Sequence, residues 1–153
     1  MNQTLVDTPI GQLNIVADEH ALYKVEWLDS TYVNASIMSN ALTKNIGSLL
    51  AQYFLNANIN FSVPFAKAGT PFQRRVWQYL QTIPVGETLS YSEVAEALST
   101  SPRAVGNACR ANPFVIIVPC HRVVSKSGIG GYSGQTAGNK IAIKQWLLVH
   151  ERH

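Results

Sequence analysis

Charged side chains are scarce in this chain: they make up 14% of its 153 residues, whereas apolar residues make up 46%. Intrinsic disorder needs low hydrophobicity together with a high net charge, so this composition excludes a largely disordered chain. Collagen-like, coiled-coil and low-complexity chains need compositional biases that are also absent. The apolar content is enough for a sizeable core, in one ordinary domain or two small ones.

Long apolar runs are missing as well. The longest, such as Phe114 to Pro119, fall far short of the roughly 20 residues that span a bilayer. The first residues contain no basic segment leading into an apolar stretch, which a secretory signal would need. We therefore expect a soluble, non-secreted, cytoplasmic protein without a membrane partner.

Cysteine is rare too. Only Cys109 and Cys120 occur, and they form no CxxC pair, so neither a disulfide framework nor a four-cysteine zinc site is available. Free cysteines are most often small buried hydrophobic residues, and this interpretation holds unless the surrounding residues favour a reactive thiol.

The net charge of +3 is unevenly divided along the chain. Residues 1–69 contain three basic and five acidic side chains, whereas residues 70–153 contain nine basic and four acidic ones. A basic half is consistent with a nucleic-acid partner, but ordinary solvated lysines and arginines give the same pattern. Charge alone leaves both interpretations open.

The first half of the chain reads as strands followed by one helix. Turn residues at 8–11 lead into alternating apolar residues at 13–17, and a second apolar stretch at 22–28 completes an antiparallel hairpin. The apolar spacing at 42–55 predicts a helix lying on a sheet. For residues 56–68 we expect a turn, one more strand and a crossing to the second half.

Three short helices are predicted in the second half, each opened by a capping residue. Thr70-Pro71 opens the first, Ser90 with a glutamate three residues later opens the second, and Ser101-Pro102 opens the third. The second and third helices, joined by a tight turn, predict a helix-turn-helix. Small side chains dominate the third, at 103–111, which suits close packing against either another helix or a DNA groove.

The most informative segment surrounds the second cysteine. An apolar, β-branched run at 114–118 lies between two prolines, which predicts a buried strand, and Cys120, His121 and Arg122 follow. An imidazole and a guanidinium next to a thiol favour the nucleophilic thiolate. His121 reaches the sulfur only if the chain turns there or a water bridges them. A reactive and a merely buried Cys120 both remain open.

A glycine-rich loop at 128–134 precedes the last predicted helix, at 142–150. The residue before Lys140 is Asn, where a phosphate-binding loop would need Gly, so we reject binding of a nucleoside triphosphate. Glu151, at the end of the helix, is either a solvated carboxylate or the group that orients His121 as a base.

Taken together, these segments resemble the O6-alkylguanine-DNA alkyltransferases, also called methylated-DNA–protein-cysteine methyltransferases. The segments that carry the resemblance are Pro-Cys-His-Arg-Val-Val at 119–124, Ser90-Tyr91, Arg103-Ala104-Val105-Gly106, Asn112-Pro113 and Trp-Leu-Leu-Val-His-Glu at 146–151. The match extends upstream through residues 69–73 and more loosely to 8–11, so it covers nearly the whole chain.

The resemblance implies an α/β plus α fold, with a small ribonuclease-H-like α/β domain at residues 1–68 and a winged helix-turn-helix domain at residues 69–153. It implies direct repair of O6-alkylguanine, and of O4-alkylthymine, in double-stranded DNA after base flipping. The alkyl group would pass irreversibly to Cys120, so each molecule would act once. The chain would work as a monomer, without a cofactor.

The resemblance also assigns roles to particular residues. Cys120 would be the thiolate acceptor, His121 the base acting through a water, and Glu151 the carboxylate that orients the histidine. Asn112 would brace the turn that carries the cysteine, and Tyr91 would help to rotate the nucleotide and contact the base.

Further contacts are implied with the base and with DNA. The base pocket would also include Cys109, Val123, Tyr132 and Ser133, with Cys109 as a soft packing surface. Arg103 would enter the base stack from the minor groove and fill the gap left by the flipped guanine. The other DNA contacts would come from Ser90, Ala104, Gly106, Asn107 and Arg110.

The sequence departs from the family pattern in two ways. Some relatives hold a zinc ion in the amino-terminal half, but here that half has no cysteine and only His20, so we predict no metal. Residues 135–139 form an insertion before the last helix.

A non-catalytic alkyltransferase-like protein would lack Cys120, and a cysteine hydrolase would turn over repeatedly and leave Arg103 unexplained.

Overall fold

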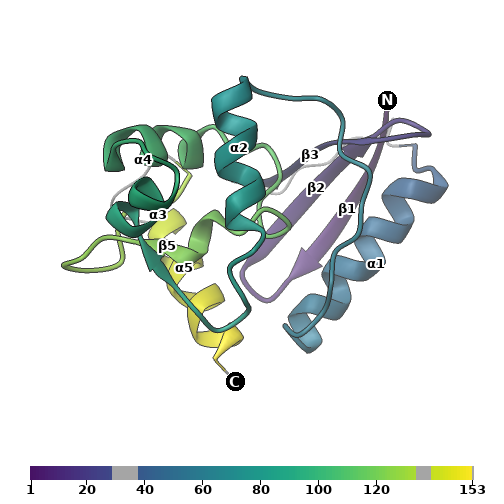
Figure 1. Cartoon of the computed structure of the whole chain (residues 1–153). Helices are drawn as coiled ribbons and strands as arrows, with labels where there is room; N and C mark the ends of the chain where they lie inside the picture. Colours follow the sequence, from purple (N-terminus) through teal and green to yellow (C-terminus); the bar gives the residue numbers. More distant parts are fainter. Residues whose placement is uncertain (29–37, 134–138, 153) are drawn as a thin grey trace. The chain divides into compact units, whose positions relative to one another are not determined.

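The computed structural model describes residues 1–28, 38–133 and 139–152, which form a mixed α/β fold (Figure 1). It divides into two compact units: Met1–Ala68 with Pro113–Val115, and Gly69–Asn112 with Ile116–His153. Pro113–Val115, which fall in the range expected for the second domain, therefore pack with the first unit. Residues 135–138 of the predicted insertion lie outside the described residues.

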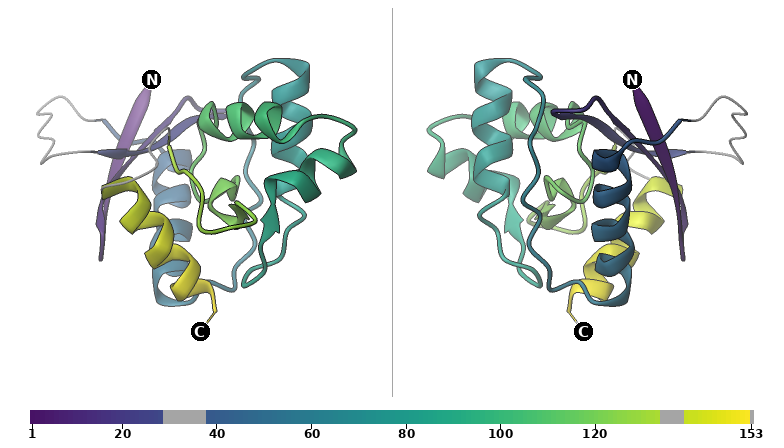
Figure 2. Two further views of the ribbon diagram at one scale, coloured as in Figure 1. Left: turned by 90° about the vertical axis from the view of Figure 1, so that its left-hand side faces the viewer. Right: turned by 90° about the vertical axis from the view of Figure 1, so that its right-hand side faces the viewer.

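The first unit is an antiparallel sheet covered by one helix. Strand β2 (Gly11–Ala17) is central and pairs with both β1 (Asn2–Thr8) and β3 (Leu22–Leu28). Helix α1 (Ala41–Leu55) packs against β1 and β2, as both views in Figure 2 show. Leu13, Ile15 and Ala17 of β2 and Ile46 and Leu50 of α1 are fully buried, so the hairpin and the helix predicted from the apolar spacing are confirmed.

The prediction of a strand within residues 56–68 is wrong. Only an isolated bridge forms there, between Leu22 and Phe65, flanked by the hydrogen bonds from the Leu22 amide to the Pro64 carbonyl and from the Ala66 amide to the Leu22 carbonyl. Proline lacks the N–H that a longer ladder requires, so the pairing is confined to this point.

The second unit is built around three short helices: α2 (Pro71–Leu80), α3 (Tyr91–Ala97) and α4 (Pro102–Arg110). The predicted caps are all present, because the side-chain oxygens of Thr70, Ser90 and Ser101 each accept a hydrogen bond from the amide three residues later. Helices α2 and α3 both pack against α4. A short parallel pair, β4 (Leu89–Ser90) with β5 (Val123–Val124), and helix α5 (Asn139–Glu151) complete the unit.

The apolar run at 114–118 is buried as predicted, but it is not a strand. It forms consecutive turns, with a single bridge between Phe114 and Val25. Ile116 has a φ of +71°, in the left-handed region that β-branched residues rarely adopt. The Asn112 side chain donates to the Val118 carbonyl at 2.9 Å and closes the turn. The apolar pattern thus predicted the burial of this segment correctly but predicted its backbone conformation incorrectly.

No helix in the described parts of the chain is both long enough and apolar enough to cross a membrane.

Candidate active site

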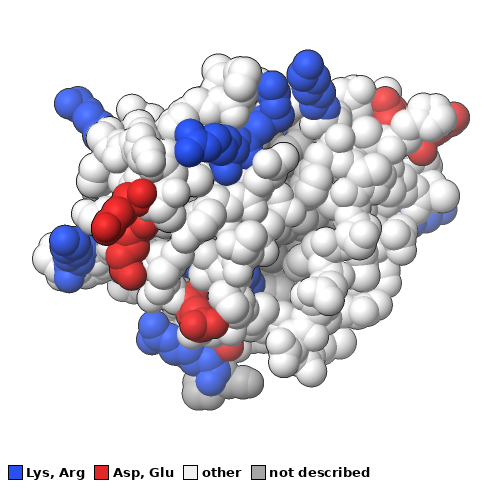
Figure 3. All heavy atoms as spheres, viewed as in Figure 1, with Lys and Arg blue, Asp and Glu red and all other residues white. Residues whose placement is uncertain are grey.

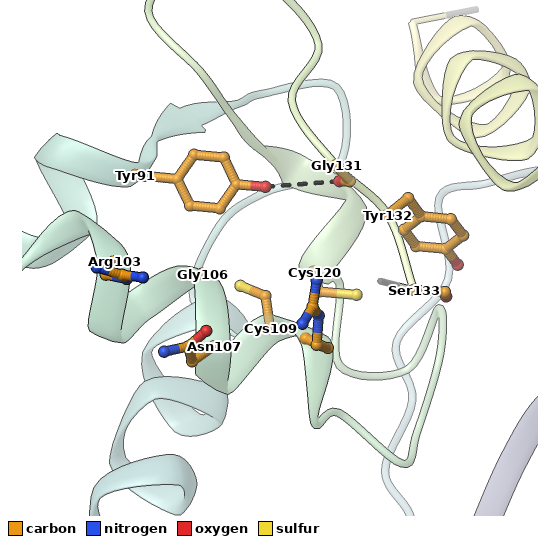
Figure 4. Close-up of a pocket in the computed structure, with 10 residues that line it drawn as sticks. Tyr91, Arg103, Gly106, Asn107, Cys109, Cys120, Gly131, Tyr132 and Ser133 are labelled. Atoms are coloured by element: carbon orange, nitrogen blue, oxygen red, sulfur yellow. Dashed lines mark hydrogen bonds between the residues drawn. The ribbon is translucent and has the colours of Figure 1, made fainter. Parts of the chain in front are cut away.

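A pocket of about 270 Å³ opens beside Cys120 in the second unit (Figure 4). It is lined by Tyr91, Arg103, Gly106, Asn107, Cys109, Arg110, Cys120, Gly131, Tyr132 and Ser133. All of these except Gly131 were predicted site residues. In the view of Figure 4, Cys120 lies between Tyr91 on one side and Tyr132 and Ser133 on the other.

Three predicted contact residues do not line this pocket. Ser90 caps helix α3 by accepting from the Glu93 amide at 3.0 Å, and Ala104 is half-buried on α4. Val123 is completely buried, and its carbonyl accepts a hydrogen bond from Lys144 Nζ at 2.7 Å. One acceptor site of the Val123 carbonyl is therefore already occupied.

His121, the residue after the cysteine, belongs to a buried network with Arg122 and Glu151. Residues Cys120–Arg122 form a single 3-10 turn, η1, which is the change of direction that a thiol and an adjacent imidazole need to share one site. The Nε2 atom of His121 lies 2.7 Å from Oε2 of Glu151, and Arg122 Nε donates to Oε1 of the same carboxylate at 2.8 Å. Arg122 also donates to the Ile83 carbonyl at 2.7 Å, so it is fixed at both ends.

The electrostatics of this network favour a neutral imidazole and an ionised carboxylate. Burial lowers the pKa of His121, although the hydrogen bond with Glu151 opposes that shift. Burial alone would raise the pKa of Glu151, but the hydrogen bonds from His121 and Arg122 hold it well below its usual range. We assign the neutral tautomer with the proton on Nε2, because Glu151 accepts there. The buried Nδ1 has no hydrogen-bond partner among the described residues and keeps its lone pair.

The pocket itself disfavours charge on both of its thiols. Burial raises the pKa of Cys120, while a hydrogen bond with Asn112 and the positive charge of Lys144 act in the opposite direction. Burial and the neighbouring Cys120 also raise the pKa of Cys109, and Lys144 opposes this shift. Cys109 therefore stays protonated as a packing residue, and Cys120 is the thiol with more groups that support its anion.

Tyr91 remains a hydrogen-bond donor under ordinary conditions. Burial, with smaller effects of Cys109 and Cys120, raises its pKa to about 12. Its hydroxyl donates to the Gly131 carbonyl at 3.5 Å, which places the phenol at the edge of the pocket.

The outer surface near the pocket is basic. Lys and Arg side chains gather over α2 and α4 (Figure 3), and α4 contributes the exposed Arg103 and Arg110 that also line the pocket. The described residues contain no group of three or more His, Cys, Asp or Glu side chains that could hold a metal ion.

Comparison with known proteins identifies the family. Residues 71–153, more than half of the chain, match the family described as 6-O-methylguanine DNA methyltransferase, DNA binding domain. The chain belongs to this family of O6-methylguanine-DNA methyltransferases. It is 38% identical over 159 residues to the constitutive methylated-DNA–protein-cysteine methyltransferase of Bacillus subtilis, and the alignment covers 97% of this chain and 94% of that protein.

Solved structures of this methyltransferase family are also similar along the whole chain. The Mycobacterium tuberculosis O6-methylguanine methyltransferase is 36% identical, with a TM-score of 0.83 over 99% of this chain and 92% of that one. The M. tuberculosis OGT in complex with DNA is 35% identical, also with a TM-score of 0.83, over 99% and 93% of the two chains.

From the sequence, Arg122 was expected only to favour the thiolate, and Lys144 was given no role. The resemblance assigned no role to Arg122, whose partners Glu151 and Ile83 are distant in sequence. Lys144 was missed, although its position carries a signal: it lies three residues from both Ile141 and Leu147, on the apolar side of the predicted helix. A lysine on such a face has either a partner or a function.

Proposed function

We propose that this chain repairs O6-alkylguanine, and O4-alkylthymine, in double-stranded DNA by transferring the alkyl group to Sγ of Cys120. Membership of the methyltransferase family supports alkyl transfer as the reaction. The observation that carries the assignment to Cys120 is its place in the pocket, in the same 3-10 turn as His121, which is paired with Glu151. The other nucleophile candidate, Cys109, lacks such a pair.

The proton of the thiol has a defined route. His121 holds its proton on Nε2 against Glu151, so Nδ1 accepts the Cys120 proton through one bridging water. The thiolate then attacks the alkyl carbon in line, a C–S bond forms, and the bond from that carbon to O6 breaks. The electron pair of the broken bond stays on the base, where a hydroxyl from Tyr91 or Ser133 hydrogen-bonds it.

The product explains why each molecule acts once. A thioether at Cys120 offers no leaving group, and the only other thiol, Cys109, stays protonated. No cofactor enters the reaction, because every bond made or broken involves the base, the alkyl group or the protein itself.

DNA binding falls to α3, α4 and the turn between them, which we interpret as the helix-turn-helix of a winged domain. We interpret the first unit as a ribonuclease-H-like domain. The small residues Ala104 and Gly106 let α4 approach a minor groove closely. The exposed Arg103 at the pocket rim is suited to fill the space of a flipped base. Contacts are mainly to phosphates, so affinity falls as salt rises. The chain acts as a monomer.

Intact mass spectrometry with duplex DNA containing O6-methylguanine tests the proposal. The wild type should gain one methyl group on the Cys120 peptide and stop after one equivalent, and Cys120→Ser should gain none. Binding to the duplex without a mass gain would indicate a damage-recognition protein instead. Turnover of activated esters beyond one equivalent would indicate a hydrolase.

Arg103 gives a second test that separates base flipping from chemistry. Arg103→Ala should slow methyl transfer from duplex DNA much more than benzyl transfer from free O6-benzylguanine, which needs no flipping. Arg152→Ala, which removes an exposed arginine at the end of the chain, is the matched control. Equal losses in both assays for Arg103→Ala would contradict the flipping role.

A further inference from the structure

Lys144 is a completely buried lysine in the middle of helix α5. Its Nζ donates to the Val123 carbonyl of β5 at 2.7 Å and to the Gly131 carbonyl at 2.8 Å. A single ammonium therefore joins three segments: the last helix, the strand that follows the η1 turn, and the loop that forms one wall of the pocket.

The same ammonium faces the opposite wall. Its nitrogen lies 5.9 Å from the centre of the Tyr91 ring, within the range of a cation–π interaction. The Tyr91 hydroxyl and Lys144 also share one acceptor, the Gly131 carbonyl. The separation of Tyr91 from the loop thus depends on where the ammonium sits.

Lys144 has no carboxylate partner within the parts of the chain that the structure describes. The ion pairs among the described residues are Lys24–Glu26, His121–Glu151 and Arg122–Glu151, and none includes it. Burying an ammonium without a counter-charge is costly, and here burial lowers the pKa of Lys144 to about 8, against the opposing effects of Cys120 and Cys109. The Lys144 amine is therefore still mostly in its protonated, charged form at neutral pH.

The groups that interact electrostatically with Lys144 limit the choice of its anion. They are Tyr91, Cys109, Cys120 and His121. Tyr91 and Cys109 keep their protons because burial raises the pKa of each, and His121 is never an anion. Cys120 is the one group of the four that the proposed reaction requires as an anion.

We propose that Lys144 is a positioning residue for alkyl transfer: its buried ammonium is the counter-charge of the Cys120 thiolate and holds the Val123 and Gly131 carbonyls that shape the pocket. This inference rests on the proposed role of Cys120. It assigns to α5 two separate contributions, the carboxylate that orients the base and the cation that stabilises the nucleophile.

The test measures the protonation of Cys120 without DNA. The pH dependence of Cys120 carbamidomethylation by iodoacetamide, located by peptide mass spectrometry, gives the pKa of the thiol. In Lys144→Met this profile should shift upward by about one pH unit, which makes the reaction about tenfold slower at neutral pH. Lys140→Met, which removes a positive charge one turn earlier on α5, should leave the profile unchanged.

Lys144→Arg separates charge from geometry. It retains the charge, so the pH profile should stay near that of the wild type, but a planar guanidinium cannot reproduce the two carbonyl contacts of an ammonium. Methyl transfer from DNA should then be slower even though the thiol titrates normally. Should Lys144→Met not fold by circular dichroism, Lys144→Gln removes the charge while retaining a donor, and the same upward shift is expected.

A wild-type profile in the neutral variants would overturn the proposal, as would equal shifts in Lys144→Arg and Lys144→Met. The two proposals fail separately. If the wild type shows a Lys144-dependent thiolate but takes no methyl group from DNA, the proposed function is wrong and the electrostatic role of Lys144 stands. If the wild type takes the methyl group but the pKa of Cys120 is the same with and without Lys144, only the role proposed for Lys144 is wrong.

Discussion

Glu151 Oε2 lies 2.7 Å from His121 Nε2, and both side chains are buried. This contact ties the last turn of α5 to the turn that carries Cys120, across 30 positions of the sequence. Arg122 strengthens it by donating to both carboxylate oxygens, at 2.8 and 3.0 Å. The orientation of the base at the reaction centre is thus determined by the final helix.

Replacing Glu151 with Gln tests this orientation directly. The amide keeps the size of the side chain but removes its negative charge, so it no longer selects the imidazole tautomer that frees Nδ1. We expect methyl transfer from O6-methylguanine DNA to slow by about 10²- to 10⁴-fold, measured as the rate of mass gain on Cys120. Glu96→Gln, an equal charge change at an exposed site on α3, should keep the wild-type rate. A normal rate in Glu151→Gln would exclude the carboxylate from the proton route.

Acid should weaken the folded protein through the same carboxylate. Despite its burial, Glu151 has a pKa held below its ordinary value of 4.5 by His121 and Arg122, so the folded state binds that proton less tightly than the unfolded state. The resulting stabilisation is fully present above pH 4.5 and is lost as the pH falls further. Between pH 5 and 3, the wild type should lose about 2 kcal/mol of unfolding free energy relative to Glu151→Gln in urea titrations. Parallel pH curves for the two proteins would contradict this assignment.

The parts of the molecule that the sequence predicts well are those governed by local contacts. Thr70, Ser90 and Ser101 each cap a helix through an amide only three residues away, so a short motif is sufficient to find them. The hairpin and α1 were predicted because their apolar period follows from the geometry of the elements themselves.

The parts that the sequence does not predict depend on distant partners. Turns replace the strand expected at 114–118 because the φ of Ile116 lies in the left-handed region, which no local sequence pattern predicts. The only sequence signal of Lys144 is that it places a charge on an apolar helix face. Its partners are the backbone carbonyls of Val123 and Gly131, and the residue types at these two positions do not indicate the contact. Such contacts emerge only from the tertiary structure.

The glycines of the pocket loop differ in what they tolerate. Gly130 has a φ of +76°, and a Cβ there would lie 2.9 Å from Cε2 of Tyr91. Gly130→Ala should therefore cost about 1–2 kcal/mol of stability, and it should slow alkyl transfer by displacing the loop from Tyr91. Gly128→Ala is the matched control, because its Cβ would meet only Ser125 Oγ, at 4.0 Å. Thermal unfolding and single-turnover rates measure both effects, and equal losses in the two variants would refute the argument.

The buried ammonium of Lys144 predicts a stability change at alkaline pH with the same sign as that of Glu151, because the folded state lowers the pKa of both groups. Its pKa is lowered from 10.5 to about 8 by burial, so between these values the unfolded chain holds a proton that the folded chain has released. Stability linked to this group therefore rises with pH across that interval, by up to about 3 kcal/mol. In a Cys120→Ser background, which removes the thiolate, the unfolding free energy should rise over this range relative to the same protein carrying Lys144→Met. The difference between the two proteins cancels the other titrating groups, and a difference that stays constant from pH 8 to 10.5 would show that the folded state does not release this proton.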